Sequence, residues 1–432
     1  MKFCDKRVKL MLGIFLLALV VRLVYFFLFS NENLFGDGQR YFQIAGALFQ
    51  GGYVDPSVLL SWTPGYPAFL WLITIFFGKN ILAMKFIQHL IGAMTAVLVF
   101  VLGSKIFNEK VGVVAGVLWA IYGYSVLFAD LILTETLFLF FFTLLLIFSS
   151  GEINYKKSAI AGLLLGLNVL IRSAAKGFFL IIPIVLYLRK KIDLRKVAVI
   201  VIIGLVLTMP YIAYLYSQFN KFIFLDATSE WAFYMFNNPE ADQIYNNKLS
   251  PETIERIDAI SDGRSNENGY ILGASYIISN PVKFISDSWI RLVLFFWVET
   301  YSLGADTSDK YYDGLSNDPI YVSFGYYTIL FFVAVMLLAI PALFYSEPKN
   351  RLMLFLFMIY FILLYIVVHA EQRYHIQIMP IVMLFSAFTV VNWKEILGKI
   401  KLDRKFAAMA FTYLVLITAW AYGFYLFIIL DL

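Results

Sequence analysis

The feature that most constrains this chain is a series of apolar runs, each about 20 residues long, the length that an α-helix needs to cross a bilayer. Hydrophobic residues make up 61% of the 432 residues and charged residues only 15%, whereas soluble domains carry about 25% charged residues. The runs do not alternate between polar and apolar residues, as the strands of a membrane barrel do. The sequence therefore predicts an all-α polytopic membrane protein.

Eleven membrane spans are predicted from these runs. They are 9–30, 81–103, 111–129, 131–149, 158–172, 174–188, 197–216, 320–345, 352–369, 374–391 and 406–429. Two long polar segments, 31–80 and 217–319, interrupt the series. Since no internal repeat divides the chain, we expect residues 1–432 to form a single domain with these two segments as its large loops.

The distribution of positive charge predicts the orientation. Most of the 34 Lys and Arg residues lie in short segments that share one side if the N-terminus is cytoplasmic. The C-terminus and both long polar segments are then external, in the membrane of a bacterial or archaeal cell. The single cysteine, Cys4, excludes an intrachain disulfide. The basic residues are scattered over short loops, so no nucleic-acid partner is expected.

The first polar segment continues directly from a span with NLFGDGQRYFQIAGALFQGG, residues 33–52. Asp37, Arg40, Tyr41 and Ile44 have the spacing of neighbours on one face of a helix lying on the membrane. A carboxylate base beside a cation that can hold a phosphate suits the transfer of a phosphate-linked group. The alternatives are that Asp37 is a helix N-cap and that Arg40 reaches towards lipid headgroups.

Two further stretches are predicted to be interfacial helices, 61–78 in the first polar segment and 283–296 in the second. The acidic stretch 299–319 does not match the calcium-loop pattern and is expected to be a solvated loop. A divalent metal is possible but not indicated, and no other cofactor is expected.

Acidic and basic residues within the spans are functional candidates, because such groups are costly there. Glu135 is one, with capping of backbone amides as its alternative. Asp130 is expected to be an exposed turn residue, and Arg22 to extend outward to the headgroups.

Three further cations are candidate phosphate ligands. Arg373 either contacts phosphate, with Tyr374 positioning the sugar or lipid, or pairs with Glu371. Arg172 and Lys176 lie at a predicted external turn, where they either bind phosphate or anchor the turn.

Seven segments, in order, resemble the GT-C class of membrane glycosyltransferases. More narrowly, the chain resembles the dolichyl-phosphate-mannose–protein mannosyltransferases and the bacterial lipid A aminoarabinose transferase (glycosyltransferase family 39-like). The segments are GDGQRYFQIAGALFQGG, TPGYPAFLWL, LILTETLFLF, LIRSAAKGFFLIIP, WAFYMFNNPEAD, NPVKFISDSWIRLVLFFW and EQRYHIQIMPIVMLF. The resemblance implies a GT-C-like bundle of about eleven transmembrane helices, with two external loops carrying interfacial helices.

The resemblance also implies an activity and a set of site residues. Such enzymes pass a sugar from a polyprenyl-phosphate donor to a glycan, lipid or protein acceptor on the external side, with inversion at the anomeric carbon. The expected catalytic carboxylates are Asp37 and Glu135. The expected donor-phosphate ligands are Arg40, Arg373, Arg172 and Lys176, and the expected substrate-positioning residues are Tyr41, Tyr374, Glu371 and Asn238.

The sequence departs from these relatives at two points. The mannosyltransferases carry two adjacent acids where Asp37 is followed by Gly38, and the aminoarabinose transferase carries an acid and a lysine where this chain has SWTPGYP. Both differences argue against a bound metal and a lysine contact to the donor phosphate.

Two other functions compete with the transferase. A transporter or flippase of lipid-linked sugars would also need cations, but it would usually show inverted repeats and interrupted spans. A non-catalytic subunit that binds such lipids would carry the same carboxylates.

Overall fold

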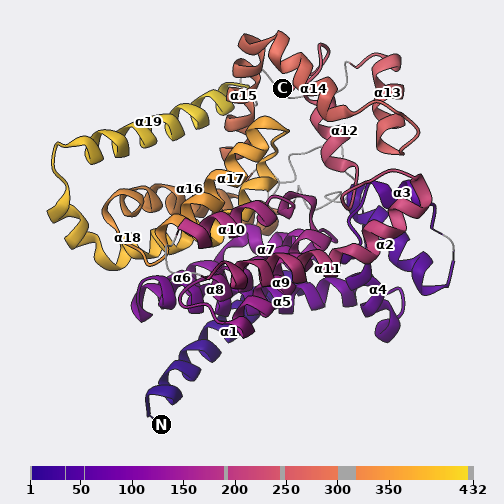
Figure 1. Ribbon diagram of the computed structural model, residues 1–432. Helices are drawn as coiled ribbons and strands as arrows, with labels where there is room; N and C mark the ends of the chain where they lie inside the picture. The colour runs from indigo at the N-terminus through magenta and orange to yellow at the C-terminus, as the bar shows by residue number, and fades with distance from the viewer. Residues whose placement is uncertain are drawn as a thin grey trace.

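The computed structural model describes residues 2–34, 36–52, 54–188, 193–243, 249–299 and 318–426. Within these ranges all regular structure is helical (Figure 1). Twelve of the helices follow the predicted spans: α1 Lys2–Phe29, α5 Ile81–Ile106, α6 Glu109–Ile121, α7 Gly123–Asp130, α8 Glu135–Ser149, α9 Tyr155–Ile171, α10 Phe178–Leu188, α11 Leu194–Phe219, α16 Pro319–Tyr345, α17 Arg351–Val367, α18 Met379–Lys399 and α19 Arg404–Phe424.

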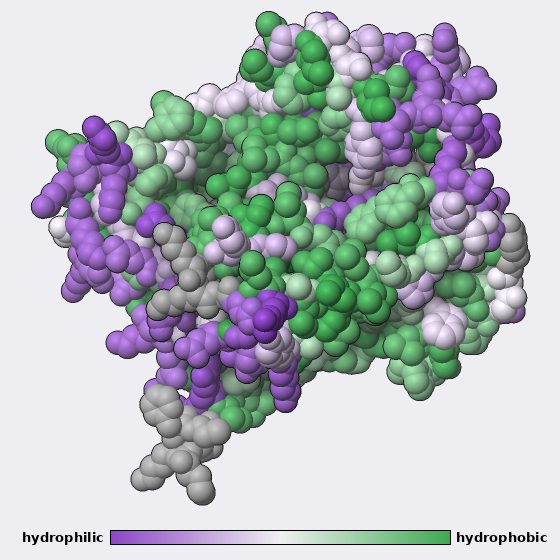
Figure 2. Space-filling model, in the orientation of Figure 1, coloured by the Kyte–Doolittle hydropathy of each residue, from purple (hydrophilic) through white to green (hydrophobic). Residues whose placement is uncertain are grey.

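Six of the described helices are long and apolar enough to cross a membrane by themselves: α1, α5, α11, α16, α18 and α19. A seventh span results if α6 and α7, bent by 50° at Tyr122, are counted together. The other four predicted spans are helices α8, α9, α10 and α17, which have 11 to 17 residues. Figure 2 shows a broad hydrophobic surface with hydrophilic residues at either side of it. The chain is thus an integral membrane protein.

The bend between α6 and α7 explains why Arg22 does not extend outward, as the sequence suggested. Its side chain is fully buried. Its guanidinium donates to the carbonyl of Ala120 at 3.1 Å and to the Ser125 hydroxyl at 2.9 Å. The last carbonyls of a helix lack intrahelical partners, and Arg22 satisfies one of them where α6 ends inside the protein.

The two polar segments carry short helices. The first contains α2 Gly36–Phe49, α3 Pro56–Leu60 and α4 Gly65–Phe77. The second contains α12 Thr228–Met235, α13 Pro251–Ser261, α14 Gly269–Ser279 and α15 Pro281–Phe296, which gather at the top of Figure 1. Of the acidic stretch, residues 300–317 lie outside the described residues, as does the end of the last predicted span from residue 427 on.

Helix α15 fixes the second polar segment to the bundle. It packs on α17 and α19, and two of its three charged residues, Asp287 and Arg291, are buried. The buried Arg291 guanidinium donates to the carbonyl of Val367 at 2.8 Å and to the side-chain oxygen of Asn237 at 3.1 Å. One cation thus ties the end of α17 to the chain that follows α12.

Helix α5 lies at the centre of the bundle, where it packs against α1, α6, α7 and α8. Its buried face carries polar residues as well as apolar ones. These polar residues contact the connections that lead from α1 into α2 and from α7 into α8.

Candidate functional site

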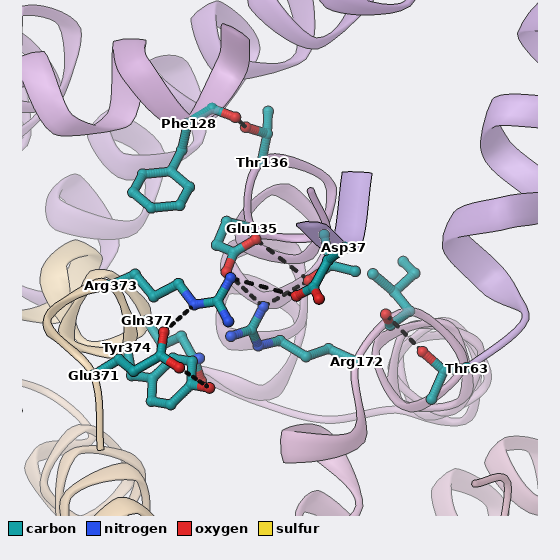
Figure 3. A network of polar contacts seen from close by, with 12 residues as sticks. Asp37, Thr63, Phe128, Glu135, Thr136, Arg172, Glu371, Arg373, Tyr374 and Gln377 are labelled. Atoms are coloured by element: carbon teal, nitrogen blue, oxygen red, sulfur yellow. Dashed lines mark hydrogen bonds and ion pairs between the residues drawn. The ribbon is translucent and has the colours of Figure 1, made fainter. Parts of the chain in front are cut away.

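A cleft lies between α2, the start of α8, the turn from α9 to α10, α12 and the end of α17. Its volume, open mouth included, is about 970 Å³. The charged side chains at its wall are those of Asp37, Glu135, Arg172 and Arg373, together with His369. These residues come from four separate parts of the chain, and Figure 3 shows the side chains of Asp37, Glu135, Arg172 and Arg373 converging.

Glu135 and Arg172 form the inner ion pair of the cleft. Glu135 is the first residue of α8, where the helix dipole favours a negative charge, and only 2% of its side chain is exposed. The Nη1 atom of Arg172 lies 2.9 Å from its carboxylate and 2.6 Å from the Thr134 hydroxyl. Glu135 therefore binds a guanidinium rather than capping backbone amides.

The remaining nitrogens of Arg172 are also engaged. In the amide orientation that satisfies both of its ends, Gln377 accepts from Nε at 3.0 Å and from Nη2 at 3.1 Å. The guanidinium carbon lies 5.7 Å from the centre of the Tyr374 ring. Arg172 is therefore a fixed positive charge in the wall of the cleft.

Asp37 and Arg373 form a looser, outer pair. Nη1 of Arg373 lies 3.5 Å from the Asp37 carboxylate, which is long for an ion pair. The Asp37 side chain is 39% exposed and that of Arg373 is 20% exposed. Asp37 is therefore open to a molecule in the cleft, whereas Glu135 is not.

Glu371 forms an ion pair with Arg373, which is one of the two alternatives that the sequence offered. Its carboxylate lies 2.6 Å from Nε of Arg373 and 3.2 Å from Nε2 of His369. Burial by itself would raise the pKa of Glu371, but the charge of Arg373 and the hydrogen bond with His369 outweigh burial and lower it to about 2. Glu371 therefore stays ionised and orients Arg373.

Aromatic rings shape the cleft around these charges. Tyr374 stacks on Tyr365 with ring centres 4.4 Å apart. Tyr41 meets Trp62 edge to face at 4.9 Å and Tyr66 at 4.8 Å. Burial, together with the charge of Asp37, raises the pKa of the Tyr41 hydroxyl, so it stays protonated. Tyr41 and Tyr374 line the cleft, as expected for residues that position a substrate.

Besides Glu371, which lies behind Arg373, three predicted site residues lie outside the cleft wall. Arg40 is exposed on the outer side of α2. Lys176 pairs with the buried carboxylate of Asp226 at 2.9 Å, which favours the turn-anchoring alternative. The buried amide of Asn238 donates to the carbonyl of Met235 at 2.8 Å, at the end of α12. Asn238 therefore stabilises a helix end and does not face the cleft.

The expectation that Asp130 is an exposed turn residue is wrong. Its carboxylate is fully buried, 3.4 Å from Nζ of Lys85 and 3.3 Å from Nε2 of His89. The predicted span 81–103 contains three polar residues about one helical turn apart, Lys85, Gln88 and His89. Ionisable residues inside spans are rare, so this pattern could have revealed the cluster.

The described residues contain no group of three or more His, Cys, Asp or Glu side chains that could hold a metal ion. Asp37 and Glu135 each face a guanidinium instead.

Comparison with known proteins gives a family match and a fold match. Residues 61–214 match the family model for dolichyl-phosphate-mannose-protein mannosyltransferase. No curated protein matches the sequence. The apo oligosaccharyltransferase of Archaeoglobus fulgidus has a similar fold, with a TM-score of 0.51 and 14% identity, over 96% of this chain and 55% of that one. The chain thus spans about half the length of that structure.

Two structures of ArnT from Cupriavidus metallidurans are also similar, both with a TM-score of 0.44 over 93% of this chain and 81% of that one. One is the apo state, at 13% identity, and the other is bound to undecaprenyl phosphate, at 12% identity. The resemblance predicted from the seven segments is confirmed: the chain is a membrane protein with a GT-C fold that is similar, across residues 61–214, to the dolichyl-phosphate-mannose-protein mannosyltransferases.

Proposed function

We propose that this protein transfers a sugar from a polyprenyl-phosphate donor to an acceptor hydroxyl or amine on the external side of the membrane, with inversion at the anomeric carbon. The observation that carries the proposal is the outer pair of Asp37 and Arg373, which places an accessible base and a phosphate-binding cation 3.5 Å apart in the cleft. The family match supports it, because the matched residues 61–214 include Glu135 and Arg172.

The reaction follows from the chemistry of this pair. The acceptor oxygen or nitrogen attacks the anomeric carbon and forms the new glycosidic bond. The bond from that carbon to the phosphate oxygen breaks, and polyprenyl phosphate leaves with the electron pair. Asp37 takes the acceptor proton as general base. Arg373 stabilises the negative charge that develops on the leaving phosphate.

Glu135 and Arg172 have a different role in this scheme. Glu135 is almost fully buried and bonded to Arg172, so it does not reach an acceptor. Arg172 has its nitrogens engaged by Glu135, Thr134 and Gln377. We assign this pair to the electrostatics of the site: Arg172 supplies a fixed positive potential near the leaving phosphate, and Glu135 keeps it in place.

The looseness of the outer pair implies an order of binding. A donor phosphate that enters the cleft competes with Asp37 for Nη1 of Arg373, while Glu371 keeps hold of Nε. Donor binding therefore releases Asp37 from its cation and makes it available as a base. The donor binds first in this scheme, and the acceptor follows.

The orientation of the chain is part of the proposal. The N-terminus is cytoplasmic, and the C-terminus, both polar segments and the cleft are external, in a bacterial or archaeal cell membrane. The residues 1–432 act as one domain, with 31–80 and 217–319 as its external loops.

The test is turnover of a panel of radiolabelled polyprenyl-phosphate sugars by purified protein in lipid nanodiscs. We expect release of polyprenyl phosphate by the wild type, and a loss of at least 100-fold in Asp37→Asn, as is typical when a general base is removed. Arg373→Ala and Arg40→Ala show which cation holds the phosphate. The matched control is Arg264→Ala, which breaks an exposed ion pair with Asp262 in the second polar segment.

The same preparation in proteoliposomes tests the competing function. Movement of the lipid-linked sugar across the bilayer, with no cleavage by wild type or any variant, would replace the transferase by a flippase. Cleavage that is unaffected by Asp37→Asn would leave a transferase with a different base.

A further inference from the structure

We propose that Tyr66 and Gln88 are positioning residues. They fix the segment that carries Asp37 against the segment that carries Glu135. The kinetic part of this inference rests on the proposed function, whereas its structural part does not. Neither side chain lines the cleft, and both are fully buried. They lie on helices α4 and α5, away from the residues that would touch substrate.

First, a row of polar side chains on α5 contacts the connection from α1 to α2. Lys85, Gln88 and His89 are spaced three and four residues apart, so they share one face of the helix, and all three are buried. Lys85 donates to the carbonyl of Asn31 at 2.6 Å, in the connection that leads from α1 to Asp37. It also pairs with Asp130, which accepts from the Ser30 hydroxyl as well.

The second step is the connection from α7 to α8. The amide nitrogen of Gln88 donates to the carbonyl of Leu131 at 2.7 Å and to that of Ala129 at 3.3 Å. Glu135 follows four residues after Leu131. The same face of α5 therefore holds the chain just before each of the two carboxylates.

The third step joins the two connections through one side chain. The amide oxygen of Gln88 accepts from the Tyr66 hydroxyl at 2.8 Å, and the Tyr66 ring packs edge to face on Tyr41, one turn after Asp37. The start of α2 also lies directly on the second connection, because a Cβ at Gly38 would be 3.2 Å from the carbonyl oxygen of Ile132. Gln88 thus contacts the Glu135 segment directly and the Asp37 helix through Tyr66.

This arrangement predicts a catalytic effect without contact to substrate. A buried amide that loses one partner is left unsatisfied, and the surrounding chain shifts to satisfy it. Misplacement of a reacting group by about 1 Å can cost up to about 100-fold in rate. Loss of the Tyr66 hydroxyl is therefore expected to lower kcat by about tenfold or more, while the affinity for polyprenyl phosphate changes less than about twofold.

The experiment uses Tyr66→Phe as the main variant and Gln88→Leu as the more severe one. The matched control is Tyr413→Phe, which removes a hydroxyl that bonds to the Leu337 carbonyl at 3.0 Å, between α19 and α16. If Tyr66 acts by placing the base, Tyr66→Phe lowers kcat in the wild type but adds no further loss to Asp37→Asn. An equal fold-loss in both backgrounds would overturn the inference.

A second readout does not depend on turnover. Hydrogen exchange of the full-length protein in nanodiscs is expected to rise at least threefold in peptides covering 31–45 and 128–137 in Gln88→Leu, with Tyr413→Phe unchanged in both. Unchanged exchange in these peptides would overturn the positioning role. Inactive wild type with increased exchange in both peptides of Gln88→Leu would instead sink the proposed function and leave the coupling of the segments in place.

Discussion

Replacing Asp37 by Asn is expected to tighten the binding of polyprenyl phosphate while it lowers turnover by about 100-fold or more. In the wild type, a phosphate that enters the cleft must displace the Asp37 carboxylate from Nη1 of Arg373, 3.5 Å away. Asparagine has the same shape but no charge, so it competes less for the cation and does not repel the phosphate. A residue that served only to build the site would weaken binding when altered, which makes the direction of this effect diagnostic.

The size of the gain follows from the exposure of the pair. Two unit charges about 4 Å apart attract with about 1 kcal/mol in water and about 4 kcal/mol near a protein surface. The Asp37 side chain is 39% exposed and that of Arg373 is 20% exposed. We therefore expect the net attraction between them to lie near the range measured for exposed ion pairs, about 0.2–1 kcal/mol. A loss of up to about 1 kcal/mol of competition corresponds to roughly fivefold tighter binding.

The assay is equilibrium binding of a short-chain polyprenyl phosphate to protein in nanodiscs, at two salt concentrations. The gain should shrink at high salt, because the competing pair is partly exposed. Asp262→Asn, which breaks the exposed pair with Arg264, is the matched control and should leave affinity unchanged. Equal or weaker binding by Asp37→Asn would refute the exchange of partners at Arg373 and with it the order of donor before acceptor.

Three further predictions concern the residues around this pair. Glu135→Gln should lower stability by about 3–5 kcal/mol, because it leaves the 13%-exposed Arg172 without its carboxylate; a denaturant titration measures this, and a loss below 1 kcal/mol would contradict it. Arg172→Lys should lower kcat by about tenfold or more, since a lysine cannot replace the planar contacts to Glu135 and Gln377; unchanged kinetics would argue against a fixed charge. Ionised Glu371 should stabilise the fold fully above pH 4.5 and lose this contribution as the pH falls through about 2, so Glu371→Gln should flatten the acid limb of the stability curve, and an unchanged limb would count against the pair.

The spans could be predicted from sequence because each is a long apolar run, and the structure places a helix at every one of them. The bend at Tyr122 was missed, because 111–129 reads as one continuous run and the break is stabilised by Arg22 from a distant helix. Asp37 was predicted from its helical spacing with Arg40 and Tyr41, and Glu135 because a carboxylate within a span is costly.

Tertiary packing determines which side chains of α2 face the cleft and which partner Lys176 has, and neither can be read from the sequence. On a helix with 100° per residue, Arg40 and Tyr41 lie on opposite sides of Asp37. A shared face therefore cannot say which neighbour turns inward, and packing on Trp62 and Tyr66 selects Tyr41. The buried partners of Lys176 are likewise invisible in sequence, because Asp226 lies 50 residues away.

The short helices have a consequence for the membrane itself. Helix α17 has 17 residues and therefore spans about 25 Å, less than the roughly 30 Å of bilayer hydrocarbon. It packs beside the still shorter α10, and residues such as Leu180, Tyr187 and Leu363 expose large apolar side chains. We expect the bilayer along this side to thin locally, which is one way in which a membrane accommodates a short apolar span. Hydrophobic mismatch then makes acyl-chain length a variable of the protein's stability, with thinner bilayers favouring the folded bundle.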